Sequence, residues 1–427
     1  MAEFKNQHNQ SMPLLGTIIL VSLILIEIGV CLVPFNYRPD FHISLFQHSL
    51  PLHHLIFTLS GLLLMAITAN VFIKKKELPS FIVVSAVLLA SMLLSAAFTL
   101  GDKRDAFQTC LGFFVRGLVP GFAAYVLVTH FNGEKPLSHF LIGLGGLISC
   151  ASLFELFTGR YFLFDRFASQ FTASDGFASG PVGQPLPLAV LLNLLFPLSL
   201  MAWNATKRWT VLLVTALIAL TIVLTFRRSG YLLMLSTSVL FFAVSSQKKK
   251  GVLLLLGLIG ALLLLNATSP YIRKKTLDRF SIASTIREIE SAHRTRTYGT
   301  TAKIFVDHPW LGLGTRQFTK LHGQYATYKK AIDSPDNQYL RFLSEGGVVG
   351  FLAFLLFIGW ILRTVWIHRA TMEDWAYFFS LINFSLALIL VDGLYWPALQ
   401  TTFLVVAGAA VGKAHLNSNQ MNREMFS

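Results

Sequence analysis

Long apolar runs recur along the whole chain and are separated by shorter polar segments. A helix needs about 20 mostly apolar residues to cross the hydrocarbon core of a membrane. Runs near this length predict an all-α polytopic membrane protein with about twelve transmembrane helices. The predicted spans are Met12–Val33, Leu52–Ile73, Leu78–Leu100, Phe107–Val128, Leu137–Leu153, Leu186–Trp203, Trp209–Phe226, Gly230–Ser245, Gly251–Leu265, Val348–Val365, Trp375–Val391 and Ala398–Val411.

The composition agrees with this pattern. Charged residues make up 13% of the 427 residues, hydrophobic residues make up 54%, and the mean hydropathy is +0.60. Ordinary globular chains carry about 25% charged residues. These values exclude a secreted, a nucleic-acid-binding and a disordered protein. Cys31, Cys110 and Cys150 lie in or beside apolar runs, so no disulfide framework or zinc site is predicted.

Lysine and arginine clusters fall in alternate loops between the predicted spans. Short loops rich in these residues stay on the cytoplasmic side of a membrane. We therefore expect both termini to be cytoplasmic. The clusters are Lys74 to Lys76, Lys135, Lys207 with Arg208, Lys248 to Lys250, and Arg363 with Arg369.

One outward segment, residues 266–347, is too long for a turn and is predicted to be a partly helical extracytoplasmic insertion in a single membrane domain of residues 1–427. A shorter outward segment covers residues 154–185. The insertion has 13 Lys and Arg against 7 Asp and Glu. Long translocated loops escape the orientation rule. The positive charge therefore either binds a polyanionic ligand such as a phosphate or is incidental on a solvated loop.

Ionisable residues within spans or at their edges are costly and become functional candidates. Glu27 and Arg116 lie inside predicted spans, where they form a structural ion pair or have a function. Arg227 and Arg228 lie at the outer end of a span, and Asp392 lies at another outer end. The adjacent arginines either bind a lipid-linked phosphate or contact lipid head groups.

Two motifs in the long insertion have turn and helix-start signals. Pro309 ends a helix predicted over Tyr298–Val306, and Gly312 and Gly314 permit a tight turn. In that turn the backbone amides face a ligand, or the turn is a plain connection.

The second motif starts a helix after Pro335, and a glycine-rich break at Gly346 and Gly347 leads into the tenth span. Asp336 is either the N-cap of this helix or a carboxylate positioned to take a proton.

The order and spacing of these motifs resemble the O-antigen ligase and O-antigen polymerase superfamily of bacterial membrane glycan transferases. The resemblance covers about residues 155 to 365. The segment Gly180 to Ala189 also resembles a family segment, with Leu188 where the family has asparagine. The other matching residues are Arg228, Arg294 or Arg296, His308, Pro309, Gly312, Gly314, Asn337, Tyr339, Leu340, Glu345, Gly347 and Gly350.

The resemblance implies inverting, metal-independent transfer of an undecaprenyl-diphosphate-linked oligosaccharide to an acceptor glycan on the outer face of the inner membrane, with no cofactor. Asp336 would be the base, standing where the ligases have histidine, and Arg228 with Arg294 or Arg296 would bind the diphosphate. His308 is the other candidate base, or it is structural. The residues implied in substrate binding are Arg227, His308, Gly312, Gly314, Asn337, Tyr339 and Glu345.

The aspartate in place of histidine favours a repeat-unit polymerase of exopolysaccharide or capsule. An O-antigen ligase that transfers the glycan to lipid A-core in lipopolysaccharide is the alternative. A secondary transporter or flippase of a polyanionic lipid-linked substrate is a second alternative, although the halves of the chain show no internal repeat. A non-catalytic membrane scaffold or sensor is a third.

Overall fold

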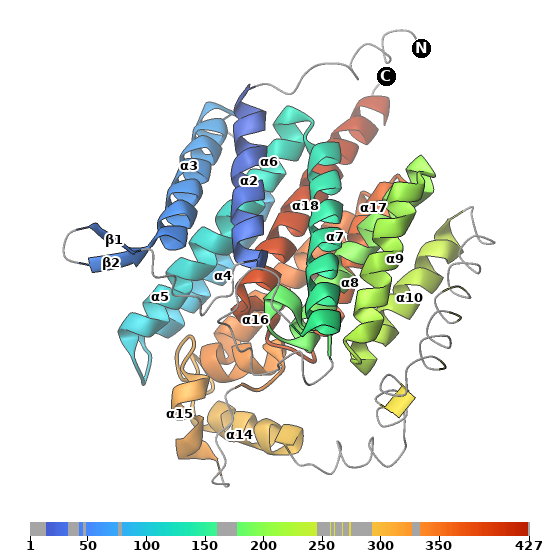
Figure 1. Ribbon diagram of the computed structural model, residues 1–427. Helices are drawn as coiled ribbons and strands as arrows, with labels where there is room; N and C mark the ends of the chain where they lie inside the picture. The colour runs from blue at the N-terminus through green and yellow to red at the C-terminus, as the bar shows by residue number, and fades with distance from the viewer. Residues whose placement is uncertain are drawn as a thin grey trace.

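The computed structural model describes residues 14–32, 42–45, 48–75, 79–159, 177–245, 293–326 and 334–425, and a few single positions between 257 and 274. Helices dominate this part of the chain (Figure 1). The elements are α2 (Leu14–Leu32), β1 (His42–Leu45), β2 (His48–Pro51), α3 (Leu52–Lys75), α4 (Ser80–Ala97), α5 (Lys103–Phe113), η2 (Phe114–Leu118), α6 (Val119–Phe131), α7 (Glu134–Thr158), η4 (Gly180–Val182), α8 (Pro185–Thr206), α9 (Trp209–Leu224), α10 (Arg228–Val244), α14 (His293–Asp307), α15 (Phe318–Tyr325), α16 (Gln338–Ile367), α17 (Met372–Ala387), η5 (Gly393–Tyr395) and α18 (Pro397–Met425).

The prediction of a helical membrane protein is confirmed. Within the described residues, 6 helices are long and apolar enough to cross a membrane: α2, α4, the continuous helix of α5, η2 and α6, α7, α8 and α16. Shorter apolar helices occur at Ser60–Lys74 in α3 and in α9 and α10. Except for two single positions, the ninth predicted span, 251–265, lies outside the described residues, so the number of twelve crossings and their orientation stay predictions. The antiparallel hairpin of β1 and β2 is a small departure from an all-α chain.

Helix α8 lies at the centre of the bundle, while other spans have one exposed apolar face. In α8, 89% of the span is buried, against 39% in α2 and in α16. Exposed leucines such as Leu62, Leu213 and Leu352 project from the outer helices. Apolar surface of this extent suits a lipid environment, where helices satisfy their own backbone hydrogen bonds.

Helix α18 packs closely on α6 through small residues. Gly117 of η2 and Gly121 of α6 lie against Leu404 of α18, while Gly408 and Gly412 of α18 lie against Gly121 and Tyr125 of α6. A Cβ on Gly408 would collide with the carbonyl group of Gly121, and a Cβ on Gly121 would approach the carbonyl of Leu404. Such small-residue pairs let helix backbones come together in membranes.

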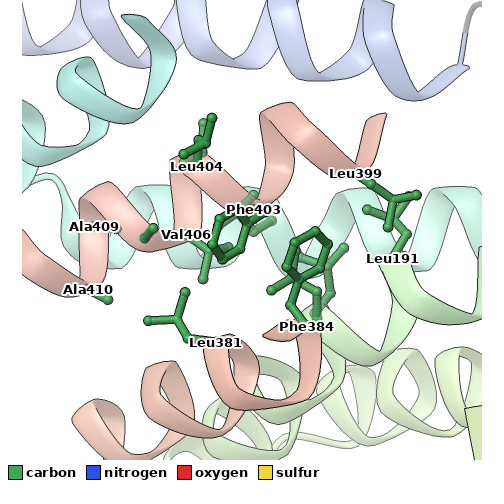
Figure 2. Close-up of a cluster of buried hydrophobic side chains, with 14 of the residues drawn as sticks. Leu191, Leu381, Phe384, Leu399, Phe403, Leu404, Val406, Ala409 and Ala410 are labelled. Carbon is green, nitrogen blue, oxygen red and sulfur yellow. The ribbon is translucent and has the colours of Figure 1, made fainter. Parts of the chain in front are cut away.

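The other side of α18 packs on α17 and α8. Figure 2 shows Phe403 of α18 against Phe384 of α17, with Leu191 of α8 nearby. The two phenyl rings are stacked, with centroids 4.3 Å apart and an interplanar angle of 12°. Both are buried, so α18 connects the N-terminal helices to the α8 core.

Gly408→Leu should prevent the approach of α18 to α6, because the new side chain would meet backbone rather than a movable side chain. We expect destabilisation of about 3 kcal/mol or more, measured as a lower thermal unfolding midpoint of the purified protein in detergent. Gly143→Leu is the matched control, since a Cβ there has nothing within 4 Å. Equal midpoints for the two variants would contradict this account of the packing.

Candidate functional site

The segments with the predicted site residues lie at one end of the bundle. Figure 1 shows α14 and α15 at this end, together with the beginnings of α10 and α16. The C-terminal end of α18 lies at the opposite end. Residues separated by more than 100 positions in the sequence are thus placed on the same face.

The turn before α10 holds Arg227 and Arg228 in a defined place. Phe226 is buried with φ 52, and its ring meets Phe177 at 6.1 Å between centroids. The guanidinium carbon of Arg227 lies 5.9 Å from the centroid of the same ring. The Tyr231 hydroxyl donates a 2.7 Å hydrogen bond to the Val223 carbonyl, which ties the start of α10 to the end of α9. Arg228 is the first residue of α10.

The remaining basic candidates lie in α14. Arg294 and Arg296 are in its first turns, but their side chains lie outside the described residues, so their roles stay predictions. At the other end of α14, His308 Nε2 lies 2.7 Å from the Tyr325 hydroxyl of α15. This contact favours the structural role of His308 over its alternative role as the base.

The predicted break in α16 is confirmed at Gly347, whose φ of 59 and ψ of −158 are not helical. The loop after α14 supplies hydrogen bonds to the unwound backbone. The Val348 amide donates to the Pro309 carbonyl at 2.8 Å, and the Leu313 and Gly314 amides donate to the Ser344 and Glu345 carbonyls at 2.9 and 3.0 Å. The break is therefore held by backbone pairing with the loop.

The expectation that the amides of the Gly312–Gly314 turn face a ligand is wrong. The Gly312 amide donates to the His308 carbonyl at 3.2 Å, and the next two amides donate to α16. Both glycines have positive φ, 64 and 107, and a Cβ on Gly312 would collide with the α16 backbone. Only glycine permits this close approach. The turn therefore seats the loop on α16.

Asn337, and not Asp336, is the N-cap of α16. The Asn337 side-chain oxygen accepts hydrogen bonds from the amides of Tyr339 and Leu340 at 3.0 and 3.1 Å. Asp336 has a left-handed backbone, φ 48, and its amide donates to Ser334 Oγ at 3.1 Å. The N-cap interpretation of Asp336 is therefore wrong, because asparagine at the next position takes that place.

Two residues expected to bind substrate have their polar groups engaged within the protein. The Asn337 side chain is 7% exposed and is occupied by the cap. The Tyr339 hydroxyl donates a 3.0 Å hydrogen bond to the Ser385 carbonyl of α17, and its ring packs on Phe354 at 5.3 Å. These contacts fix the beginning of α16 against α17.

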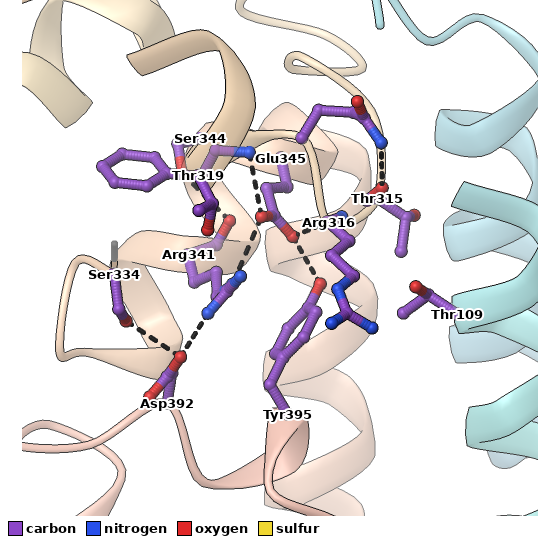
Figure 3. Close-up of polar contacts among 12 residues, drawn as sticks. Thr109, Thr315, Arg316, Thr319, Ser334, Arg341, Ser344, Glu345, Asp392 and Tyr395 are labelled. Atoms are coloured by element: carbon purple, nitrogen blue, oxygen red, sulfur yellow. Dashed lines mark hydrogen bonds and ion pairs between the residues drawn. The ribbon is translucent and has the colours of Figure 1, made fainter. Parts of the chain in front are cut away.

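Arg341 is the centre of a buried polar network at the start of α16 (Figure 3). Its side chain is 5% exposed. Its Nε lies 3.2 Å from Glu345 Oε1, and its Nη1 is paired with Asp392 Oδ2. Its guanidinium carbon lies 3.7 Å from the Tyr395 ring centroid. Asp392 also accepts a 2.8 Å hydrogen bond from Ser334 Oγ, next to the Asp336 segment.

Glu345 connects this network to the preceding loop. Its carboxylate accepts hydrogen bonds from the amides of Arg316 and Phe318 at 2.8 and 3.2 Å, and from the Tyr395 hydroxyl. Burial, with the neighbouring Glu345 charge, raises the pKa of Tyr395 well above its usual value, so its phenol remains a donor. The sequence predicts that Glu345 binds substrate. Its side chain is 2% exposed and accepts hydrogen bonds from within the protein, so its role here is structural.

Sequence reasoning did not identify the network as a unit. The spacing of Arg341 and Glu345 is the i,i+4 spacing of a helical ion pair and could have indicated this contact. Asp392 stood out only as a carboxylate at a span edge. Tyr395 and Ser334 carried no comparable signal, because their partners come from distant segments.

The predicted ion pair of Glu27 and Arg116 is wrong. The Glu27 carboxylate accepts a 2.8 Å hydrogen bond from the Thr402 hydroxyl, and the Cys31 sulfur lies 3.7 Å from it. Cys31, Cys110 and Cys150 are free thiols. Among the residues that the structure describes, no group of three His, Cys, Asp or Glu side chains is arranged to hold a metal ion.

Arg341→Met should destabilise the protein by about 3–5 kcal/mol, since it leaves Glu345 and Asp392 as buried carboxylates without a counter-ion. The thermal unfolding midpoint in detergent measures this loss. Adding Glu345→Gln and Asp392→Asn should recover part of it by removing the buried charges. Arg104→Met, at an exposed position on α5, is the control. A midpoint for Arg341→Met equal to that of the control would rule out the network as a structural support.

Comparison with known proteins gives a match to a protein family. The model of the O-antigen ligase family matches residues 212–355. No curated protein matches the chain. The matched segment contains every residue assigned above to catalysis or substrate binding from the sequence. Residues 212–355, about a third of the chain, are therefore similar to the O-antigen ligase family, in agreement with the resemblance seen in the sequence.

Proposed function

We propose that this protein is a polysaccharide repeat-unit polymerase that uses an undecaprenyl-diphosphate-linked glycan as donor. The family match supports glycan transfer in general. The observation that carries the finer proposal is the place of Asp336. It stands in the matched segment, beside the start of α16, and Asn337 rather than Asp336 caps that helix. The outer face of the inner membrane is the proposed location.

The surroundings of Asp336 support a role as the base. Its amide is held by Ser334, which donates to Asp392, and Asp392 is paired with Arg341. A base must hold its position within hydrogen-bond reach of the acceptor hydroxyl. The buried network provides that fixed support, although Asp336 itself belongs to a short connection rather than to a helix.

In the proposed reaction, the acceptor oxygen attacks the anomeric carbon of the donor sugar. The bond from this carbon to the diphosphate oxygen breaks, and its electron pair leaves with undecaprenyl diphosphate. The hydroxyl proton passes to the Asp336 carboxylate. Attack on the face opposite to the leaving group inverts the anomeric configuration.

The diphosphate leaves with a growing negative charge, and arginines are suited to stabilise it. Their planar forks give paired, charge-assisted hydrogen bonds to phosphate oxygens. We assign this role to Arg228 and to Arg294 or Arg296, with Arg227 as a neighbouring positive charge. In this proposal the guanidinium groups neutralise the leaving group without a divalent metal.

The alternatives differ in the acceptor. An O-antigen ligase would use the same donor chemistry and transfer a completed chain to lipid A-core. The aspartate where ligases have histidine is the reason to prefer a polymerase. The family match favours both over a transporter.

The glycans that accumulate in a strain that lacks this protein distinguish a polymerase from a ligase. Single repeat units that remain unpolymerised on the carrier would support the polymerase. Full-length chains left on the carrier would identify a ligase instead. An unchanged glycan length distribution and carrier pool would contradict both.

Asp336→Asn should reduce transfer at least 100-fold, in the range for loss of a general base, while expression and thermal midpoint stay near wild type. Asp336→His should restore part of the activity, because histidine can take the same proton. Asp307→Asn, an exposed carboxylate on α14, is the control. The measurement is the rate of glycan lengthening in membranes. Full activity of Asp336→Asn would remove this residue from the mechanism.

Arg228→Ala should lower transfer by about 10²–10³-fold, the cost of one lost donor to a developing charge. Arg228→Lys should recover little, since an ammonium group does not reproduce the planar fork. Arg208→Ala, exposed at the start of α9, is the matched control. The same lengthening assay applies, and equal rates for Arg228→Lys and wild type would argue against bidentate phosphate binding there.

A further inference from the structure

An asparagine side chain of α8 lies at the contact between α8 and the first turn of α10. Asn193 is 1% exposed. Its amide nitrogen donates a 3.2 Å hydrogen bond to the Gly230 carbonyl of α10 and a 2.8 Å hydrogen bond to the Ala189 carbonyl of α8. Gly230 follows Arg228 by two residues at the beginning of α10. The buried amide therefore joins α8 to the helical turn that carries Arg228.

The helices approach each other closely at this contact. A Cβ on Gly230 would lie 3.1 Å from the Ala189 Cβ and 3.4 Å from Ile222 Cγ2, so both α8 and the end of α9 pack on the glycine. Small residues at such contacts let helix backbones come together in membranes. Asn193 lies four residues after Ala189 and therefore on the same face of α8. This spacing brings its amide to the Gly230 carbonyl.

A second buried asparagine supports the first. Asn383 of α17 is 4% exposed. Its amide nitrogen donates to the Asn193 carbonyl at 3.4 Å and to the Thr237 hydroxyl of α10. Hydrogen bonds thus connect α8, α10 and α17 in the interior of the bundle. Such bonds are stronger where the surroundings have a low dielectric constant, so they hold the three helices in one arrangement.

The Asn193 amide is not the group that would give this contact the highest stability. Its two partners are carbonyl groups, which fix the nitrogen on their side. Its side-chain oxygen is buried and has no hydrogen-bond partner within the part of the chain that the structure describes. A buried acceptor without a partner destabilises a fold. Departures of this kind are expected at functional sites, where position matters more than stability.

The place of Arg228 depends on the backbone of the first turn of α10. On the α9 side, the Tyr231 amide donates to the Arg227 carbonyl at 3.2 Å. On the α8 side, the hydrogen bond from Asn193 holds the Gly230 carbonyl. A guanidinium group pairs with two phosphate oxygens in a specific geometry. A shift of this turn would therefore weaken phosphate binding by Arg228 without any change in the arginine itself.

We propose that Asn193 is a positioning residue, whose hydrogen bond to Gly230 places Arg228 for the diphosphate of the lipid-linked donor. This inference rests on the proposed function, because Arg228 is assigned to the diphosphate there. Asn193 acts through the α10 backbone and does not contact the donor, since its side chain is enclosed by α8, α10 and α17.

The test is a double-mutant cycle on donor binding. Undecaprenyl diphosphate is titrated into the full-length protein in detergent, and binding is measured by native mass spectrometry. Asn193→Leu should weaken binding about 10-fold, within the range for residues coupled through hydrogen bonds. Its thermal unfolding midpoint should stay at or above that of wild type, because the buried acceptor is lost. In the Arg228→Ala background, Asn193→Leu should cause no further loss of binding.

Thr237→Val is the matched control. It removes a buried hydrogen bond of α10 farther along the helix from Arg228, and it should bind undecaprenyl diphosphate as wild type does. If Asn193→Leu does not fold, Asn193→Ala removes the same amide without adding apolar volume and takes its place in the cycle.

A loss of binding that Asn193→Leu causes only when Arg228 is present supports the proposal. The proposal is overturned by an equal loss with and without Arg228, by wild-type binding of Asn193→Leu, by an equal loss in Thr237→Val, or by a lower thermal midpoint that accounts for the loss. The proposed function would stand in each of these cases. Wild-type binding by Arg228→Ala would instead contradict the assignment of Arg228 to the diphosphate, and this inference with it.

Discussion

The buried guanidinium group of Arg341 is the interaction on which the end of the bundle beside α14 and α15 depends. It pairs with Glu345 on its own helix and with Asp392 beyond α17, and it lies over the Tyr395 ring. A buried cation must be matched by charge and hydrogen bonds. Because those partners come from separate segments, the network joins the beginning of α16, the loop after α14 and the connection to α18.

The same network links the structural support to the proposed chemistry. Glu345 holds the amides of the Arg316 loop, and Asp392 holds Ser334 next to Asp336. The network therefore holds the segment that carries the proposed base. The break at Gly347 lets α16 turn from this polar layer into its apolar span. Stability and the proposed chemistry thus share one set of buried contacts.

Local signals in the sequence predicted the helices, the break before the α16 span and the similarity of residues 212–355 to the O-antigen ligase family. Contacts between distant segments could not be predicted in this way. Asp336 and Asn337 are adjacent and both suit an N-cap, and only the backbone decides between them. The Gly312 turn was expected to face a ligand, but its amides find carbonyls of α16, more than 30 residues away. Likewise Glu27 contacts Thr402 rather than Arg116.

The pH dependence of glycan transfer by purified wild-type protein and Asp336→His tests the central claim most directly. A base can take a proton only after it has lost its own. The unperturbed pKa is about 3.9 for an aspartate side chain and about 6.5 for a histidine side chain, so histidine becomes a base at higher pH. The account predicts that the acid limb of the rate profile moves to higher pH in Asp336→His. Identical acid limbs for two active proteins would show that residue 336 does not take the proton.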